Sequence, residues 1–182
     1  MRSLKLFLAL MLSLSASAPA LAALANGSTA PDFTAPASLA GKDYSFALAE
    51  ALKKGPVVVY FYPKAFTSGC TVEAHLFAKA MPEYQKLGAS VIGVSSDDVQ
   101  TLHKFSLSEC GGKFPVAADP DTRIMSAWDA KLPMVNYASR ISYVVTPDGK
   151  VLYSYSAMDP SQHVQNTLAA IKQWQAEQGG KP

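Results

Sequence analysis

A cysteine that follows a loop of small and hydroxylated residues carries the clearest chemistry in this sequence. The loop covers residues 63–69 (PKAFTSG), and Cys70 comes directly before a stretch with helical periodicity. Unpaired backbone N–H groups and the macrodipole at the start of a helix favour an anion by about 0.3–1 kcal/mol. The pattern therefore indicates a thiol that reacts as a thiolate.

Ionising a thiol at neutral pH requires more than a helix terminus. A free cysteine has a pKa of roughly 8.5, and lowering such a pKa to about 6 requires roughly 3.4 kcal/mol. A hydrogen-bonded guanidinium would supply most of that energy. In the loop, Gly69 allows close approach, Thr67 offers a hydroxyl, and Pro63 lacks a competing N–H. Such a loop can hold a small polar oxidant against the sulfur.

The stretches around this loop predict the frame that positions it. Residues 56–62 (PVVVYFY) and 90–96 (SVIGVSS) are typical of buried strands, and apolar residues from Val72 to Tyr84 recur at helical spacing. We also expect strands over 43–46 and 114–118, helices over 47–54, 99–109 and 122–130, and an irregular segment over 26–41.

The last part of the chain predicts a hairpin and a closing helix. RISYVVT and VLYSYS flank the turn sequence PDGK, which favours an antiparallel pair of strands. Asp159 and Pro160 then have the residue types of a helix start. The whole order predicts one α/β domain over residues 26–182, with a central mixed sheet flanked by helices, as in a thioredoxin-like fold.

The N-terminal segment reads as a cleaved signal peptide over residues 1–25. Arg2 and Lys5 precede an apolar run over 6–14, and small residues offer cleavage after Ala22 or Ala25. The run is shorter than the roughly 20 residues of a spanning helix, which argues against the alternative of an uncleaved anchor. We therefore expect a periplasmic or secreted protein with no stable membrane association after cleavage.

Composition narrows the classes of partner. The chain has 182 residues, of which 49% are hydrophobic, so it can bury a core without disulfide bonds. Removing Arg2 and Lys5 from the 16 basic residues leaves 14, against 14 acidic residues. A nearly neutral mature chain lacks the attraction that nucleic acid binding needs.

The sequence around Cys70 resembles the peroxidatic signature of the peroxiredoxins. Pro63, Thr67 and Cys70 have the spacing P-x3-T-x2-C, after VVVYFY and before a helix. The similarity extends from APDF at Ala30 through ISYVVTPDGKVLYSYS. The stretches YFYPK, GCTVEA and KLGASVIGVS are closest to the bacterioferritin-comigratory, or Q-type, branch.

The resemblance implies a role for each matching residue. Cys70 would be the peroxidatic nucleophile, Thr67 would orient the peroxide, and Pro63 would shield the pocket. Arg140, at the start of the strand before the Pro-Asp-Gly turn, would stabilise the thiolate and the developing oxyanion. The implied protein is a monomeric thiol-dependent peroxidase for hydrogen peroxide and small alkyl hydroperoxides, with no metal or other cofactor.

The second cysteine leaves several interpretations open. Many Q-type members carry a cysteine where this chain has His75, so the resemblance suggests Cys110 as the resolving residue. A Cys70–Cys110 disulfide would then be reduced by a thioredoxin-like or other dithiol protein. Because a disulfide needs Cα atoms within about 7 Å, we expect the helix turns around both cysteines to unwind first. Alternatively, Cys110 is a buried core thiol.

Two other functions use the same residues differently. A periplasmic thiol–disulfide oxidoreductase of thioredoxin-like fold needs a CxxC pair, but Glu73 stands at the second position. A third, non-enzymatic interpretation is a secreted binding domain whose two cysteines form a structural disulfide. Such a disulfide is what the count of two cysteines favours by itself. His103 and His163 have no metal-ligand spacing with Cys70, so we predict no metal site.

Overall fold

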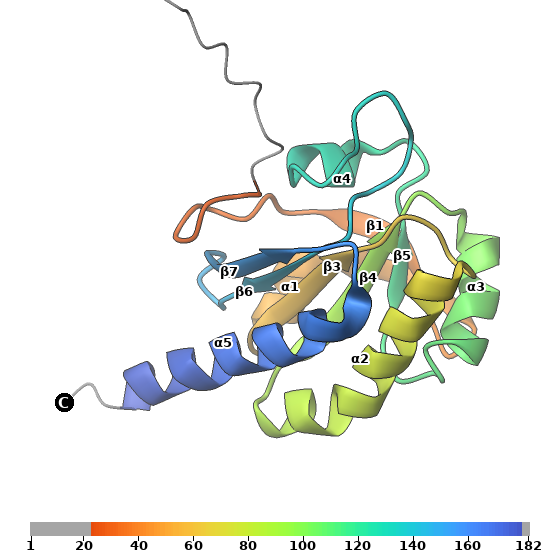
Figure 1. Cartoon of the computed structure of the whole chain (residues 1–182). Helices are drawn as coiled ribbons and strands as arrows, with labels where there is room; N and C mark the ends of the chain where they lie inside the picture. Colours follow the sequence, from red (N-terminus) through yellow and green to blue (C-terminus); the bar gives the residue numbers. More distant parts are fainter. Residues whose placement is uncertain (1–22, 180–182) are drawn as a thin grey trace, which may run out of the picture.

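The computed structural model describes residues 23–179 of the chain. Its seven-stranded sheet has the order β2-β1-β5-β4-β3-β6-β7, with helices on both faces (Figure 1). The strands are β1 (Thr34–Leu39), β2 (Lys42–Ala47), β3 (Val57–Phe61), β4 (Ser90–Ser95), β5 (Val116–Ala118), β6 (Ile141–Val145) and β7 (Val151–Ser156). The helices are α1 (Leu48–Leu52), α2 (Ser68–Lys86), α3 (Val99–Ser108), α4 (Arg123–Ala127), the 3-10 turn η1 (Pro160–Gln162) and α5 (His163–Gly179).

The sheet is mixed, which confirms the predicted fold class. Strand β3 pairs in parallel with β4, and β4 with β5, whereas β6 pairs antiparallel with both β3 and β7. Parallel neighbours require crossover helices, and the sequence supplies α2 and α3 between these strands. The hairpin of β6 and β7 follows the Pro-Asp-Gly turn as expected.

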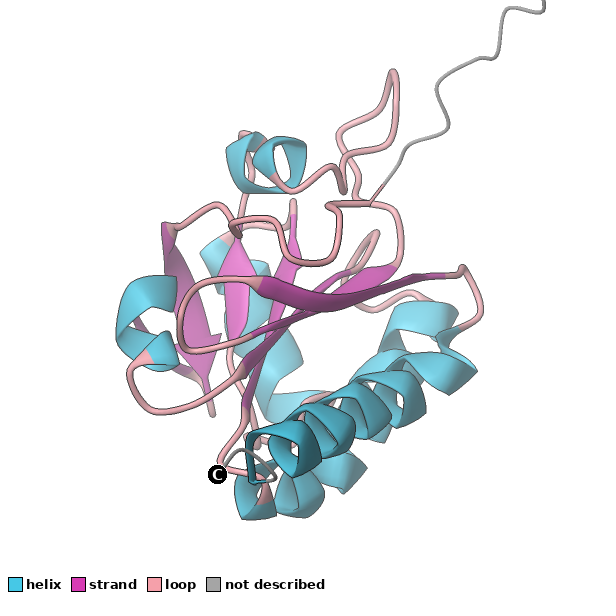
Figure 2. Ribbon diagram, turned by 90° about the vertical axis from the view of Figure 1, so that its left-hand side faces the viewer, coloured by secondary structure: helices cyan, strands magenta, loops and turns pink. Residues whose placement is uncertain are grey.

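Strand β3 divides the hydrophobic core into two layers. All its residues are buried, because its neighbours and the helices cover both of its faces. Val57, Val59 and Phe61 pack with the cluster that contains Trp128. Val58 and Tyr60 alternate with them and pack with residues of α2, α3 and α5. The paired helices α2 and α5 lie together on this second side of the sheet (Figure 2).

The structure differs from the sequence-based prediction at residues 34–39 and at the start of the closing helix. Residues 34–39 form strand β1 and not part of an irregular segment, because they pair along their length with β2 and through Ala37 and Ser38 with β5. Ala, Pro and Ser carry little strand propensity, so tertiary pairing decides here. The closing helix starts later than predicted, since Asp159 caps the short turn η1 and α5 begins at His163.

Candidate active site

Cys70 lies in the first turn of α2, almost completely buried. The helix begins after Thr67, whose backbone oxygen accepts from Thr71 N at 2.9 Å. Cys70 is 1% exposed and belongs to the core layer on that side of the sheet. The sulfur therefore sits at the positive end of a helix of 19 residues and out of bulk solvent.

Arg140 follows Cys70 by 70 positions in the sequence but contacts it in the fold. Its Nη2 donates to the Cys70 sulfur at 3.4 Å, its Nη1 donates to Glu73 Oε2, and its Nε donates to the backbone oxygen of Met158 at 2.9 Å. Only 3% of Arg140 is exposed. The guanidinium is thus fixed by three different partners, and the structure brings together the two residues whose contact the thiolate hypothesis requires.

Gly69 makes room for this guanidinium. A Cβ atom added at Gly69 would lie 3.0 Å from Arg140 Nη2, which is closer than carbon and nitrogen normally approach. Glycine at this position lets the arginine lie against the first turn of the helix. The sequence prediction that Gly69 permits a close approach is confirmed, and the approaching group is Arg140.

Thr67 and Pro63 lie in the loop that precedes the cysteine. The Thr67 hydroxyl donates to the backbone oxygen of Lys64 at 2.9 Å, so in this state it stabilises the loop and does not bond to the sulfur. Pro63 is half-buried, two residues after the end of β3. Between them, Phe66 has a left-handed backbone with φ of 64°, which is unusual for an aromatic residue. The roles of Thr67 and Pro63 toward peroxide stay predictions.

A buried polar cluster lies behind Arg140. Glu73, His163 and Ser142 are each fully buried. His163 Nδ1 lies 2.9 Å from Ser142 Oγ and 3.6 Å from Glu73 Oε1, and its Nε2 lies 2.9 Å from Ala157 O. Burial raises the pKa of the Glu73 carboxyl to about 8 against the opposing effect of Arg140. Burial also lowers the pKa of His163.

Sequence reasoning missed most of this cluster. It considered Glu73 only at the second position of a CxxC pair and His163 only as a metal ligand, and it did not consider Ser142. A single histidine at a helix start and a serine in a buried strand carry no pattern of their own. A buried serine in an otherwise apolar strand, ISYVV, was the available signal.

Cys110 follows the end of α3 and is fully buried. Both cysteines are free thiols in this state, so the disulfide that the cysteine count favours is not formed here. Burial raises the pKa of the Cys110 thiol, with a further contribution from Glu109. His75 is exposed on the surface of α2, and its Nε2 lies 3.0 Å from Glu109 Oε2. This contact links α2 to the end of α3 beside Cys110.

Among residues 23–179, no group of three or more His, Cys, Asp and Glu side chains is arranged to hold a metal ion. The chemistry of the site is that of a buried sulfur, a guanidinium and a helix terminus. This combination on a thioredoxin-like sheet defines a class of protein: an oxidoreductase that works through a cysteine thiolate.

Comparisons with known proteins agree with this class. Residues 26–154 match the family model for the AhpC/TSA family. Peroxiredoxin Bcp of Xanthomonas campestris pv. campestris is 32% identical over 122 residues, which cover 64% of this chain and 76% of that protein. The crystal structure of peroxidoxin BcpB from Mycobacterium tuberculosis has a TM-score of 0.75 and 29% identity, and the match covers 81% of this chain and 96% of that one.

A third comparison concerns a structure of the bacterioferritin comigratory protein of Xanthomonas campestris. It has a TM-score of 0.68 and 32% identity, and the match covers 76% of this chain and 90% of that one. The chain belongs to the AhpC/TSA family and is a peroxiredoxin similar to the Q-type members. It is therefore a thiol-dependent peroxidase, and neither the thiol–disulfide exchanger nor the binding domain is needed to explain its site.

Proposed function

We propose that Cys70 is the peroxidatic cysteine and that Arg140 holds it as a thiolate. The hydrogen bond of 3.4 Å from Arg140 Nη2 to the sulfur is the observation that carries this proposal. In the reaction, the sulfur bonds to one peroxide oxygen and the O–O bond breaks. The other oxygen leaves as hydroxide or alkoxide and takes up a proton, giving water or an alcohol, while Cys70 becomes a sulfenic acid.

Arg140 has two tasks in this mechanism. Before the reaction its positive charge stabilises the thiolate, and during the reaction it lies close enough to the sulfur to stabilise the oxygen that gains charge. Met158 O and Glu73 hold the guanidinium in place, so little reorganisation accompanies the reaction. Thr67 and Pro63 are assigned to orienting the peroxide and shielding the pocket, in line with the family resemblance.

We assign the resolving step to Cys110. Its sulfur would attack the sulfenic sulfur of Cys70, forming a disulfide and releasing water, and a thioredoxin-like or other dithiol protein would return two electrons. Both cysteines belong to one core layer, and the contact of His75 with Glu109 joins their helices. Because Cys70 lies in the first turn of α2 and Cys110 lies beyond the end of α3, we expect the turns that carry them to unwind before the bond closes.

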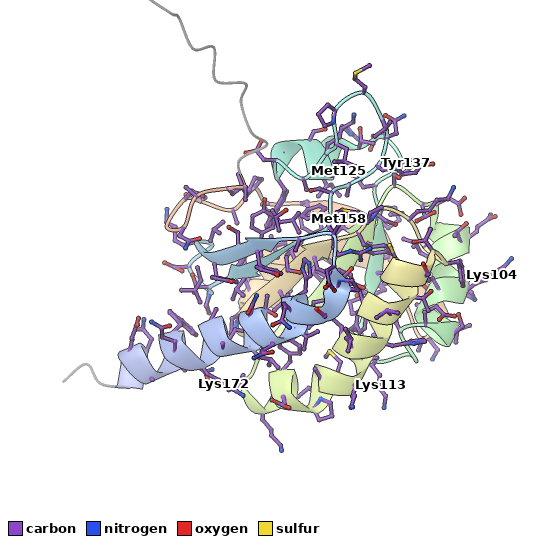
Figure 3. The ribbon with its side chains drawn as sticks, in the orientation of Figure 1. Lys104, Lys113, Met125, Tyr137, Met158 and Lys172 are labelled. Atoms are coloured by element: carbon purple, nitrogen blue, oxygen red, sulfur yellow. The ribbon has the colours of Figure 1, made fainter. Side chains whose placement is uncertain are left out.

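Hydrogen peroxide and small alkyl hydroperoxides are the proposed substrates. Support for the alkyl class comes from exposed apolar side chains in loops near the site, which we call the apolar rim: Phe66, Tyr137 and Met158. The loops of Tyr137 and Met158 lie on the side where α2 and α5 begin (Figure 3). The structure of the Xanthomonas campestris relative also concerns alkyl peroxide reduction.

We also propose that the protein is exported and is a monomer. Residues 1–22 of the predicted signal peptide lie outside the described residues. Ala23 and Leu24 pack against the core, which supports cleavage after Ala22. No helix within residues 23–179 has the length and apolar content of a membrane span. N-terminal sequencing of the protein recovered from the periplasm, with its mass in solution, tests these points.

Two serine variants test the chemistry. Cys70→Ser should consume no peroxide. Cys110→Ser should consume one equivalent, accumulate sulfenic acid at Cys70 and then stop when a dithiol protein is the reductant. Peroxide consumption by Cys70→Ser would refute the role of Cys70. Unchanged turnover of Cys110→Ser would leave the peroxidase assignment intact and refute only the resolving role.

A further inference from the structure

One oxygen of the buried Glu73 carboxyl has no hydrogen bond. Glu73 Oε2 accepts from Arg140 Nη1, but no donor reaches Oε1 among the described residues. A buried carboxylate oxygen without a donor is unfavourable, because it has lost its water and gained no partner. His163 Nδ1 lies 3.6 Å from Oε1, and a shift of about half an ångström would create a hydrogen bond.

The second nitrogen of His163 fixes which proton is available for that bond. His163 Nε2 faces the carbonyl oxygen of Ala157 at 2.9 Å, and since a carbonyl only accepts, Nε2 carries a proton. Nδ1 is then either a lone pair or a second N–H. The neighbouring Ser142 hydroxyl, at 2.9 Å, suits both states because it donates to the lone pair or accepts from the N–H.

The charges around Cys70 do not balance without this proton. Cys70 and Glu73 can both be anionic, but among residues 23–179 Arg140 is the one permanent cation in contact with them. If Glu73 is ionised and His163 neutral, the carboxylate and the thiolate compete for a single guanidinium. One proton held by either Glu73 or His163 removes that competition.

Other titratable groups that face this pair do not supply the missing charge. Tyr155 packs edge-on to the His163 ring with centroids 4.8 Å apart, and Asp159 is an exposed cap of η1. Tyr60 on β3 is fully buried beside the cluster. None of the three is a cation, so with Cys70 as a thiolate the balancing proton lies on Glu73 or His163.

We propose that Glu73 and His163 share one proton in the reduced enzyme, which keeps the pair neutral and leaves the positive charge of Arg140 to the Cys70 thiolate. This inference rests on the proposed roles of Cys70 and Arg140. His163 is a positioning residue here, since it acts through Glu73 and Arg140 and touches no reacting atom. The two residues titrate as a pair and not singly.

The proposal predicts an alkaline limb in the pH profile. When the shared proton is lost, with Glu73 having a pKa of about 8, Glu73 becomes a carboxylate and draws Arg140 away from the sulfur. The second-order rate constant for hydrogen peroxide should then fall about three- to tenfold between about pH 7.5 and about pH 9.5. A rate that depended on the thiolate alone would not fall over this range.

Three variants separate proton sharing from a structural role. Glu73→Gln replaces the carboxyl by a neutral group that accepts from Arg140 and donates to His163, so the alkaline limb should disappear, and the readout is the shape of the pH profile and not the rate at one pH. His163→Gln cannot hold the proton, so the alkaline limb should begin at lower pH. Tyr155→Phe keeps the ring against His163 and should match the unmodified enzyme.

The double variant Glu73→Gln, His163→Gln gives the decisive comparison. Under proton sharing it should behave like Glu73→Gln alone, because the group that His163 serves is already neutral. If the reductions in rate constant of the two single variants simply add in the double variant, the inference is overturned. An alkaline limb that persists in Glu73→Gln would overturn it as well. Absence of the limb in the unmodified enzyme would do so as well.

Failure of this inference is distinguishable from failure of the proposed function. Peroxide consumption by Cys70→Ser would remove the foundation, whereas strict dependence on Cys70 with an unchanged pH profile in Glu73→Gln would refute proton sharing alone. Circular dichroism would reveal whether His163→Gln folds. If it does not, the pH profile of Glu73→Gln alone still tests proton sharing.

Discussion

Arg140 and Cys70 are 70 positions apart in the sequence, and Arg140 Nη2 donates to the Cys70 sulfur at 3.4 Å. The sheet explains how they meet. Ile141 on β6 pairs with Phe61, the last residue of β3, in an antiparallel ladder. Arg140, one residue before Ile141, therefore leaves the sheet at the end where the loop to α2 begins. Strand pairing between β3 and β6 thus positions the cation beside the thiol.

Arg140→Lys should slow the first oxidation step strongly without unfolding the protein. A lysine supplies one point charge, whereas the guanidinium bonds Cys70, Glu73 and Met158 O at once. We expect the rate constant for hydrogen peroxide to fall about 10- to 100-fold. Rapid-mixing measurements test this, with Arg123→Lys as the control because Arg123 is exposed on α4. Equal effects of the two substitutions would contradict the role of Arg140.

Gly69→Ala should separate activity from stability. The new Cβ would lie 3.0 Å from Arg140 Nη2 and push the guanidinium out of position, so we expect the peroxide rate to fall about tenfold. The free energy of unfolding should change by less than about 1 kcal/mol, because the better helix propensity of alanine offsets part of the strain against Arg140. Ser68→Ala, one residue earlier and exposed, should leave the rate unchanged. A Gly69→Ala enzyme with full activity would show that the guanidinium can move freely.

The elements around the site were predictable because their residues carry strong local signals. The apolar runs of β3 and β4 and the periodicity of α2 indicated buried strands and a helix, and the structure confirms them. Strand β1 gave no such signal, since its sequence, TAPASL, becomes a strand only through its neighbours.

The site itself was predictable only in part. A cysteine after a glycine-containing loop indicates a reactive thiol by local physics, but Arg140 came from the family resemblance. The local sequence around Arg140 or Cys70 does not indicate that the two residues are in contact. His163 and Ser142 were not predicted as site residues, because their contacts form only when β6, α5 and α2 come together in the fold.

Cys110 should resist alkylation in the reduced, folded enzyme. It is fully buried, and burial raises the pKa of its thiol, so at neutral pH it is neither accessible nor ionised. Iodoacetamide labelling of Cys70→Ser, read by mass spectrometry, should be about 100-fold slower than labelling of the same protein in urea. Fast labelling in the native state would mean that the end of α3 opens without oxidation of Cys70.

The stability of the Cys70→Ser variant, which lacks the ionisable thiol and its opposite pH dependence, should decrease as the pH rises from about 6.5 to about 8. The pKa of Glu73 is raised from 4.5 to about 8 by burial, so its stabilising contribution is complete below 4.5 and is lost as the pH rises through about 8. The pKa of His163 is lowered from 6.5, so its opposite effect ends above that value.

Urea unfolding at several pH values measures this slope. The free energy of unfolding should fall by at most about 1.4 kcal/mol per pH unit in that window, and Glu73→Gln should lack this component. Unfolding free energies of Cys70→Ser that rise with pH between these limits, or an equal slope after Glu73→Gln is added to that variant, would show that Glu73 binds no extra proton on folding.

Tyr60→Phe should stabilise the protein. The Tyr60 ring is 1% exposed and stacks on Phe77 with centroids 4.4 Å apart, but its hydroxyl has no hydrogen-bond partner among the described residues. Removing an unpaired buried hydroxyl should raise the free energy of unfolding by about 1 kcal/mol. Tyr84→Phe is the matched control, because that hydroxyl lies 2.7 Å from Thr167 Oγ1 in the same core layer, and its loss should lower stability by about 1 kcal/mol. Thermal unfolding of both variants provides the measurement, and a destabilised Tyr60→Phe would mean that the hydroxyl has a partner in solution, such as a buried water molecule.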